Sequence, residues 1–144
     1  MNTVTEPLGI IGRYRSLSGR ASVYWLVTAA VVAESAVGGI WDITRMSSAA
    51  DLVTHLGYPS YFLVLLGTWK VLAAAALLVP RRALLKEWAY AGCFFVYTGA
   101  IVSHLTTGYS LSELAILIPM TALTAVSWAL RPASRRIPSL APWK

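Results

Sequence analysis

The stretch GTWKVLAAAALLVP, from Gly67 to Pro80, has the composition of a membrane-spanning helix with one charged residue in it. Leucine, valine and alanine fill most of its positions, and only Lys70 carries a charge. A charge at the centre of a transmembrane helix costs about 2.5 to 3.5 kcal/mol on insertion scales, so such residues tend to have partners and functions. Lys70 is therefore expected to point into a helical bundle and away from lipid.

The rest of the chain is also far more apolar than a soluble domain. Of its 144 residues, 57% are hydrophobic and 12% are charged, whereas soluble domains have about 45–50% and about 25%. This composition predicts an integral membrane protein whose main partner is the lipid bilayer. The net charge of +6 comes from short basic clusters between apolar runs, a pattern typical of membrane topology, so no nucleic-acid partner is expected.

Four apolar segments approach the length of about 20 residues that a bilayer requires. They cover residues 23–41, 61–79, 88–104 and 111–130. Ten of the twelve Lys and Arg residues lie before the first segment, between the second and third, or after the fourth. The positive-inside rule then places residues 1–22, the middle loop and the basic tail 131–144 in the cytoplasm. The predicted fold is an all-α, up-down four-helix bundle in a plasma membrane of bacterial type, with both termini cytoplasmic.

Two features near the first span need interpretation. A basic N-terminus followed by an apolar run and AES also resembles a cleavable signal peptide, but the apolar character resumes after Glu34, which favours a span. The first outer loop contains SSAADLVTHLGYP, from Ser47 to Pro59, which predicts a short interfacial helix. Ser48 is expected to cap its start and Gly57 to end it.

Small residues indicate which faces are buried, because transmembrane bundles are held by close packing and polar contacts. Lys70 shares a helix side with Gly67, and Glu34 lies between Ala30 and Gly38 at four-residue spacing. Both charged residues are about 10 to 14 Å below the outer ends of their helices. They are expected to meet, either as a structural ion pair or as part of a functional site.

The third span has two stripes of interest. Tyr90, Tyr97 and His104 recur every seven residues and predict a polar ladder along one face. Gly92 and Gly99 belong to a second stripe of small residues, which is expected to be the face that packs closely against a neighbouring helix.

A second polar group is expected at the outer end. His104 ends the third span, Glu113 begins the fourth, and His55 lies in the outer loop, so they form a candidate acid/base or proton-relay cluster. No metal-binding spacing accompanies the two histidines, and Cys93 is the only cysteine, so no metal site or internal disulfide is expected. The candidate catalytic residues are Glu34, Lys70, His104 and Glu113, and the candidate ligand-binding residues are Tyr90, Tyr97, His55 and Tyr58.

Three segments carry a resemblance to a known family. The segments are HLGYPSYFLVLLGTWKVLAAAALLVP (55–80), KEWAYAG (86–92) and SH (103–104). They have the order and spacing of the DoxX-like family, and the chain resembles this family over about residues 22–131. The resemblance implies four transmembrane helices and, in the founding branch, a membrane subunit of a thiosulfate:quinone oxidoreductase; other branches are linked to oxidative stress. The implied positions of interest are Gly57, Tyr58, Pro59, Lys70, Glu87, Trp88, Tyr90, Gly92, Ser103 and His104.

These observations leave three functional hypotheses. The first is a redox or redox-accessory protein that binds a lipophilic small molecule, such as a quinone, near Glu34, Lys70 and His104. No cysteine pair or evident flavin or metal site is present, so redox chemistry would need a quinone or a redox partner protein. The second is a non-redox isomerase, hydratase or cyclase that uses Glu34 or Glu113 with His104 as acid and base. The third is a structural subunit, in a homo-oligomer or with another protein; a small transporter is a weaker option.

Overall fold

The structure is a computed structural model that describes residues 8–137, with side chains from residue 19 onward. Residues 1–7 of the predicted N-terminal segment and 138–144 of the predicted basic tail lie outside the described residues. The described chain consists of helices joined by short turns, which confirms the all-α prediction. Its elements are α1 (Leu8–Ile43), α2 (Ser47–His55), α3 (Ser60–Leu78), α4 (Ala83–Thr107), η1 (Leu111–Glu113), α5 (Leu114–Leu130) and η2 (Ala133–Arg135).

Three of these helices contain stretches long and apolar enough to cross a membrane. They are Gly19–Ile43 in α1, Ser60–Leu78 in α3, and Leu111–Leu130 in η1 and α5, and they coincide with three of the four predicted spans. The chain is therefore a multi-pass membrane protein. Helix α4 covers the predicted third span and has 25 residues, but its polar ladder makes it less apolar. Its membrane crossing, and with it the count of four spans, stays a prediction.

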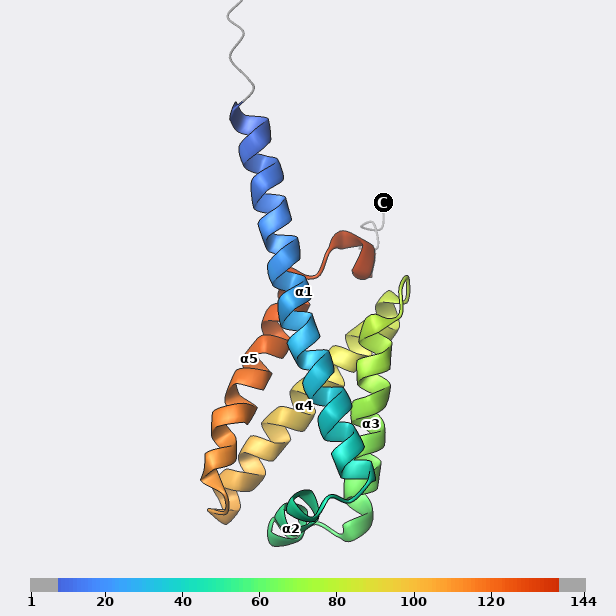
Figure 1. The fold of residues 1–144 in the computed structure, drawn as a ribbon, viewed down its shortest axis with the longest axis vertical. Helices are drawn as coiled ribbons and strands as arrows, with labels where there is room; N and C mark the ends of the chain where they lie inside the picture. Colours follow the sequence, from blue (N-terminus) through green and yellow to red (C-terminus); the bar gives the residue numbers. More distant parts are fainter. Residues whose placement is uncertain (1–7, 138–144) are drawn as a thin grey trace, which may run out of the picture.

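The four long helices form a bundle in which chain neighbours pack together. Helix α1 packs against α3 and α5, and α4 also packs against α3 and α5, so that α1 and α4 lie across the bundle from each other. Figure 1 shows α2 and the α4–α5 connection at one end of the molecule, with the α3–α4 loop and η2 at the other. The start of α1 and the end of the described chain thus lie at the same end, as an up-down arrangement requires.

The short helix predicted in the first outer loop is present as α2. It begins at Ser47, after Met46 as N-cap, and no side chain caps it, so the prediction that Ser48 is the cap was wrong. Gly57 follows the helix and has a φ of +85°, a conformation that glycine adopts without steric cost. This confirms the prediction that the helix ends at Gly57. Val53 is the buried residue of α2, which packs mainly on α3.

The closest helix contact joins α1 to α3 through two glycines. A Cβ added at Gly67 would lie 2.5 Å from the carbonyl oxygen of Gly39, and one added at Gly39 would lie 2.9 Å from that of Gly67. The prediction that Gly92 and Gly99 form the close-packing face of α4 was wrong, because both are exposed and an added Cβ would meet nothing within 4 Å. The inward face of α4 is instead occupied by its polar ladder.

That ladder is confirmed: Tyr90, Tyr97 and His104 are 3%, 2% and 2% exposed. Cys93 lies on the same buried face, and Val31 of α1 packs into the same core. The core of this bundle therefore contains hydroxyl, thiol and imidazole groups together with aliphatic side chains.

Lys86 extends the buried face of α4 to the end of the bundle near the α3–α4 loop. Its Nζ donates hydrogen bonds to the carbonyl oxygens of Ala76 (3.1 Å) and Leu77 (2.6 Å), which are among the carbonyls that the end of α3 leaves without helical partners. Arg135 also donates to the Leu77 carbonyl, at 3.0 Å. Burial, and then repulsion from Arg135, lower the pKa of Lys86 from 10.5 to about 8.

The glycine contact predicts unequal effects of the same substitution. Gly67→Ala forces α1 and α3 apart and should lower the free energy of unfolding by about 1–3 kcal/mol, the usual cost of overpacking. Gly99→Ala, on the exposed side of α4, should be neutral or slightly stabilising because alanine favours helix. Thermal unfolding of both variants in the same detergent measures the difference; equal effects would contradict the contact.

The lowered pKa of Lys86 predicts that the stability of the protein depends on pH. Because the pKa of Lys86 is lower in the folded protein than in the unfolded chain, the unfolded chain binds more protons between about pH 8 and 10.5. The free energy of unfolding should therefore rise with pH, on the order of 1 kcal/mol between about pH 7 and 9, and this gain should be lost as pH falls through about 8. Lys86→Met should abolish the slope in thermal unfolding, and an unchanged slope would refute the assignment.

Candidate functional site

Lys70, Glu34 and Tyr97 meet in the bundle and come from three different helices. Lys70 Nζ on α3 lies 3.0 Å from Oε1 of Glu34 on α1, which confirms that the two charged residues face each other. The Tyr97 hydroxyl on α4 donates a hydrogen bond to Glu34 Oε2. Asp42, near the end of α1 that leads to α2, places Oδ2 3.6 Å from the same Lys70 Nζ. These four residues are called the Lys70 cluster below.

Helix geometry explains why α1 supplies both acids. Glu34, Gly38 and Asp42 are four residues apart and therefore lie along one face of the helix. Gly38 leaves the space that the lysine occupies: a Cβ there would lie 2.5 Å from Lys70 Nζ and 3.0 Å from Glu34 Oε1. The absence of a side chain at this position lets the ammonium lie against the backbone of α1, between the two carboxylates.

A second set of contacts ties the cluster to the centre of the bundle. The hydroxyl of Ser35, beside Glu34 in the sequence, lies 3.2 Å from the Tyr97 hydroxyl and 3.8 Å from Cys93 Sγ. Ser35 and Tyr97 are almost completely buried. Polar contacts thus join α1 to α4, the two helices that lie across the bundle from each other.

The side chains of the Lys70 cluster are partly exposed at the surface of the bundle. The side chain of Glu34 is 26% exposed, and those of Lys70 and Asp42 are 13% and 12% exposed. Glu34 and Lys70 belong to stretches that cross the membrane, so this surface faces acyl chains unless another molecule covers it. The cluster also contains two carboxyl groups and one ammonium group, one acidic group more than a simple ion pair.

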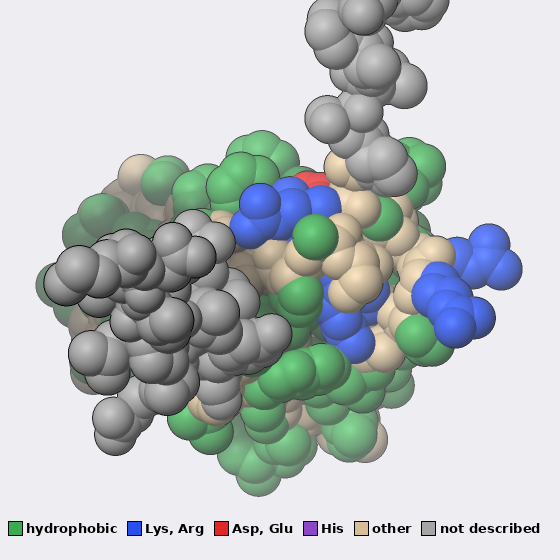
Figure 2. Space-filling model, turned by 90° about the horizontal axis from the view of Figure 1, so that it is seen from above, with side chains coloured by type: hydrophobic (Ala, Val, Ile, Leu, Met, Phe, Trp, Pro, Cys, Tyr) green, Lys and Arg blue, Asp and Glu red, His purple; other side chains and the backbone are tan. Residues whose placement is uncertain are grey.

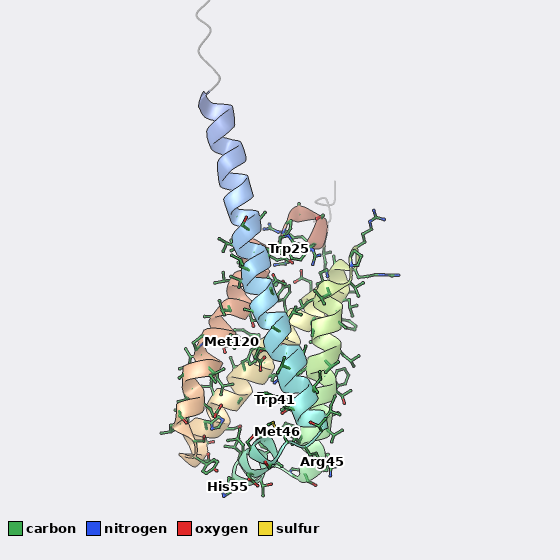
Figure 3. The ribbon with its side chains drawn as sticks, in the orientation of Figure 1. Trp25, Trp41, Arg45, Met46, His55 and Met120 are labelled. Atoms are coloured by element: carbon green, nitrogen blue, oxygen red, sulfur yellow. The ribbon has the colours of Figure 1, made fainter. Side chains whose placement is uncertain are left out.

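The residues predicted to lie at the outer end form a separate set of contacts, at the end of the bundle that carries α2. The rings of His55 and Tyr109 stack with centroids 4.5 Å apart, and His104 Nδ1 lies 2.7 Å from the Tyr109 carbonyl oxygen. Tyr58 and Ser103 join hydroxyls at 2.7 Å. Figure 3 shows His55 at the end of the bundle formed by α2, far from Trp25 at the opposite end of the membrane part of α1.

The predicted acid/base pairing around His104 has no direct contact in the structure. Among the described side chains, no ion pair or hydrogen bond joins His104 to Glu113 or to Glu34. Glu113 lies in η1, which does pack against α4. Whether these residues act as acid and base therefore stays a prediction.

Tyr90 belongs to a third polar group, nearer the α3–α4 loop. Its hydroxyl lies 2.8 Å from Ser127 Oγ, which in turn lies 2.7 Å from Thr28 Oγ1. Tyr90 and Tyr97 are seven residues apart, or about 10 Å along α4. The structure therefore divides the predicted ligand-binding residues Tyr90, Tyr97, His55 and Tyr58 among three places.

Sequence reasoning missed Asp42 and Ser35. Asp42 follows Trp41, at which the sequence predicts the first span to end, so the sequence places it in a loop. The available signal was its spacing of eight residues from Glu34, which returns it to the same helix face. Ser35 carried no signal of its own, because a serine next to a charged residue occurs in many helices.

Glu87, another position implied by the resemblance, has a well-defined environment at the opposite end of the bundle. Its carboxylate pairs with Arg131 at 2.7 Å and accepts a hydrogen bond from the Trp128 indole at 2.8 Å. Arg131 also lies over the Trp128 ring, 4.3 Å from its centroid. Through this ion pair and hydrogen bond, Glu87 links the start of α4 to the end of α5.

Comparison with known proteins identifies the family. The model of the DoxX-like family matches residues 26–130, a region that contains the four residues of the Lys70 cluster and Ser35. The chain belongs to the DoxX-like family. Neither the search of curated proteins nor that of solved structures gave a match.

The ion pair predicts strong coupling between Glu34 and Lys70. Lys70→Met and Glu34→Gln should each lower the free energy of unfolding by about 1–3 kcal/mol, because each removes an oppositely charged partner from the other group in an apolar setting. The double variant should cost less than the sum, with a coupling energy of about 1–2 kcal/mol. Thermal unfolding of the four proteins gives the cycle, and additive effects would show that the pair contributes nothing.

Proposed function

We propose that this DoxX-like membrane protein binds a lipophilic small molecule of the quinone type at the Lys70 cluster, as a membrane redox or redox-accessory component. The observation that carries the proposal is the meeting of Lys70 and Glu34, which lie in membrane-crossing stretches of α3 and α1, with Tyr97 of α4. Charged and hydroxyl groups are expensive at this depth, and where they converge they mark candidate sites.

The donors of the cluster fit the carbonyl oxygens of a quinone. An ammonium group has three N–H donors, and the described contacts direct Lys70 toward two acceptors, Glu34 and Asp42. A third donor is therefore available for a ligand oxygen. The Tyr97 hydroxyl can supply a second hydrogen bond if it turns from Glu34, and the surrounding helix faces are apolar enough to receive the ligand's tail.

The cluster also offers carboxyl groups for the proton transfers that quinone chemistry requires. Reduction of a quinone to a quinol consumes two electrons and two protons, and the proposal takes the electrons from a redox partner protein. Glu34 and Asp42 both lie within 4 Å of one ammonium, and the proposal uses one of these carboxyl groups to pass protons, one at a time, next to Lys70. Asp42 lies one residue before the end of the membrane stretch of α1, which gives this proton a short path to the outer surface.

Access from the membrane suits a lipophilic ligand. The exposed part of Glu34 and Lys70 lies within membrane-crossing stretches, so a molecule dissolved in the bilayer can reach them without crossing water. The proposal includes four crossings, cytoplasmic termini and a location in a bacterial-type plasma membrane. The basic side chains gathered at one end of the molecule, seen in Figure 2, support this orientation under the positive-inside rule.

The alternatives predict different behaviour. A structural subunit needs the Lys70–Glu34 pair for stability but gains nothing from a quinone. An acid/base enzyme centred on His104 would depend on the outer-end contacts among His55, His104 and Tyr109, and would not depend on Lys70.

Ligand-induced stabilisation tests the proposal. A ligand that binds only the folded protein raises the unfolding temperature, by an amount that depends on its concentration relative to Kd. Decylubiquinone should stabilise the wild type in nanodiscs, while Lys70→Met and Glu34→Gln should lose most of this effect, each compared with its own ligand-free state. This comparison separates loss of binding from loss of folding.

Thr68→Val is the matched control, because Thr68 is exposed on α3 and its hydroxyl bonds only to the Val64 carbonyl within its own helix. It should keep the full stabilisation by decylubiquinone. A Lys70→Met protein that folds and is stabilised as much as the wild type would overturn the proposal. His104→Gln with unchanged stabilisation would place the ligand away from the outer end.

A further inference from the structure

A surface hollow of about 530 Å³ lies at the α3–α4 loop and is lined by Val79, Arg81, Arg82, Ala83, Leu84 and Leu85. We propose that this hollow binds an anionic phospholipid, with Arg81 and Arg82 on the phosphate and the flanking apolar side chains along the acyl chains. The site is separate from the Lys70 cluster, and the inference does not rest on quinone binding.

The two arginines are available for an anion. Both are exposed, and no acidic side chain of the described residues pairs with either of them. The neighbouring basic residues of the same end are already engaged: Arg131 pairs with Glu87, and Lys86 and Arg135 donate to the Leu77 carbonyl. Guanidinium groups are well suited to phosphate because they form paired, charge-assisted hydrogen bonds.

The apolar lining indicates that the anion is part of a lipid. Leu84 is 57% exposed, Leu85 is 42% exposed and Val79 is 39% exposed, although a soluble phosphate would make no use of them. They follow the end of the α3 membrane stretch at Leu78, where headgroups meet acyl chains. Basic pockets at the ends of transmembrane helices bind anionic headgroups by this combination of charge and apolar surface.

The local backbone helps to present the headgroup contacts. Arg81 has φ of 57°, a left-handed conformation that is uncommon for a residue with a side chain and that turns the chain sharply between α3 and α4. The first turn of α4, Ala83 to Leu85, has no side-chain cap and also lines the hollow. In Figure 2, which looks onto this end of the molecule, Lys and Arg side chains lie directly beside hydrophobic ones.

Native mass spectrometry of the full chain tests the inference by counting bound lipids. Phosphatidylglycerol should bind in preference to phosphatidylcholine of the same chain length. The double variant Arg81→Gln/Arg82→Gln should bind phosphatidylglycerol about 10- to 30-fold more weakly, since each basic residue near the surface contributes about a five-fold gain in affinity. Both substitutions are at exposed positions, and helix content measured by circular dichroism confirms folding.

Arg45→Gln is the matched control, because Arg45 is also an exposed loop arginine with positive φ, of 51°, but lies at the opposite end of the bundle. It should leave the preference for phosphatidylglycerol unchanged. Equal binding of the two lipids, unchanged binding by the double variant, or equal loss in Arg45→Gln would overturn the proposal. Binding of glycerol phosphate as tight as that of the lipid would do so too, because the apolar lining would then contribute nothing.

Discussion

The ammonium group of Lys70, held between the carboxylates of Glu34 and Asp42, is the interaction on which the arrangement of α1 and α3 depends. An unpaired charge at this depth would oppose insertion, so the two helices have to meet at this level. Gly38 provides the space for the ammonium, and Gly39 and Gly67 let the two backbones touch one turn away. Charge pairing and close packing thus fix the same helix contact.

The same interaction explains the unusual core. Tyr97 on α4 completes the hydrogen bonding of Glu34, and Ser35 completes that of Tyr97. A polar centre therefore reaches across the bundle, and Gly92 and Gly99 lie on the exposed side of α4. Val31 and Leu77, at 0% and 1% exposure, belong to the core cluster that also contains Tyr90 and Tyr97.

The sequence predicted the features that follow from periodicity and charge: the membrane stretches of α1, α3 and α5, the helix α2, the polar ladder of α4, and the meeting of Glu34 with Lys70. It did not predict that Asp42 joins the same lysine, because the helix continues past the apolar run that defined the span. The sequence also predicted, wrongly, that the closely packed helix face contains Gly92 and Gly99 of α4. A stripe of small residues shows that a face can approach another helix closely, but only the tertiary arrangement decides which stripe does so.

The central claim is that the Lys70 cluster receives a lipophilic molecule and is more than a structural ion pair. The most direct test is to purify the wild type and Lys70→Met from the same cells in lipid nanodiscs, release the bound small molecules, and quantify them by mass spectrometry per mole of folded protein. The account predicts a quinone in near-stoichiometric amount with the wild type and a large loss in Lys70→Met. A wild type that carries only phospholipids, or equal amounts of quinone in both proteins, would contradict it.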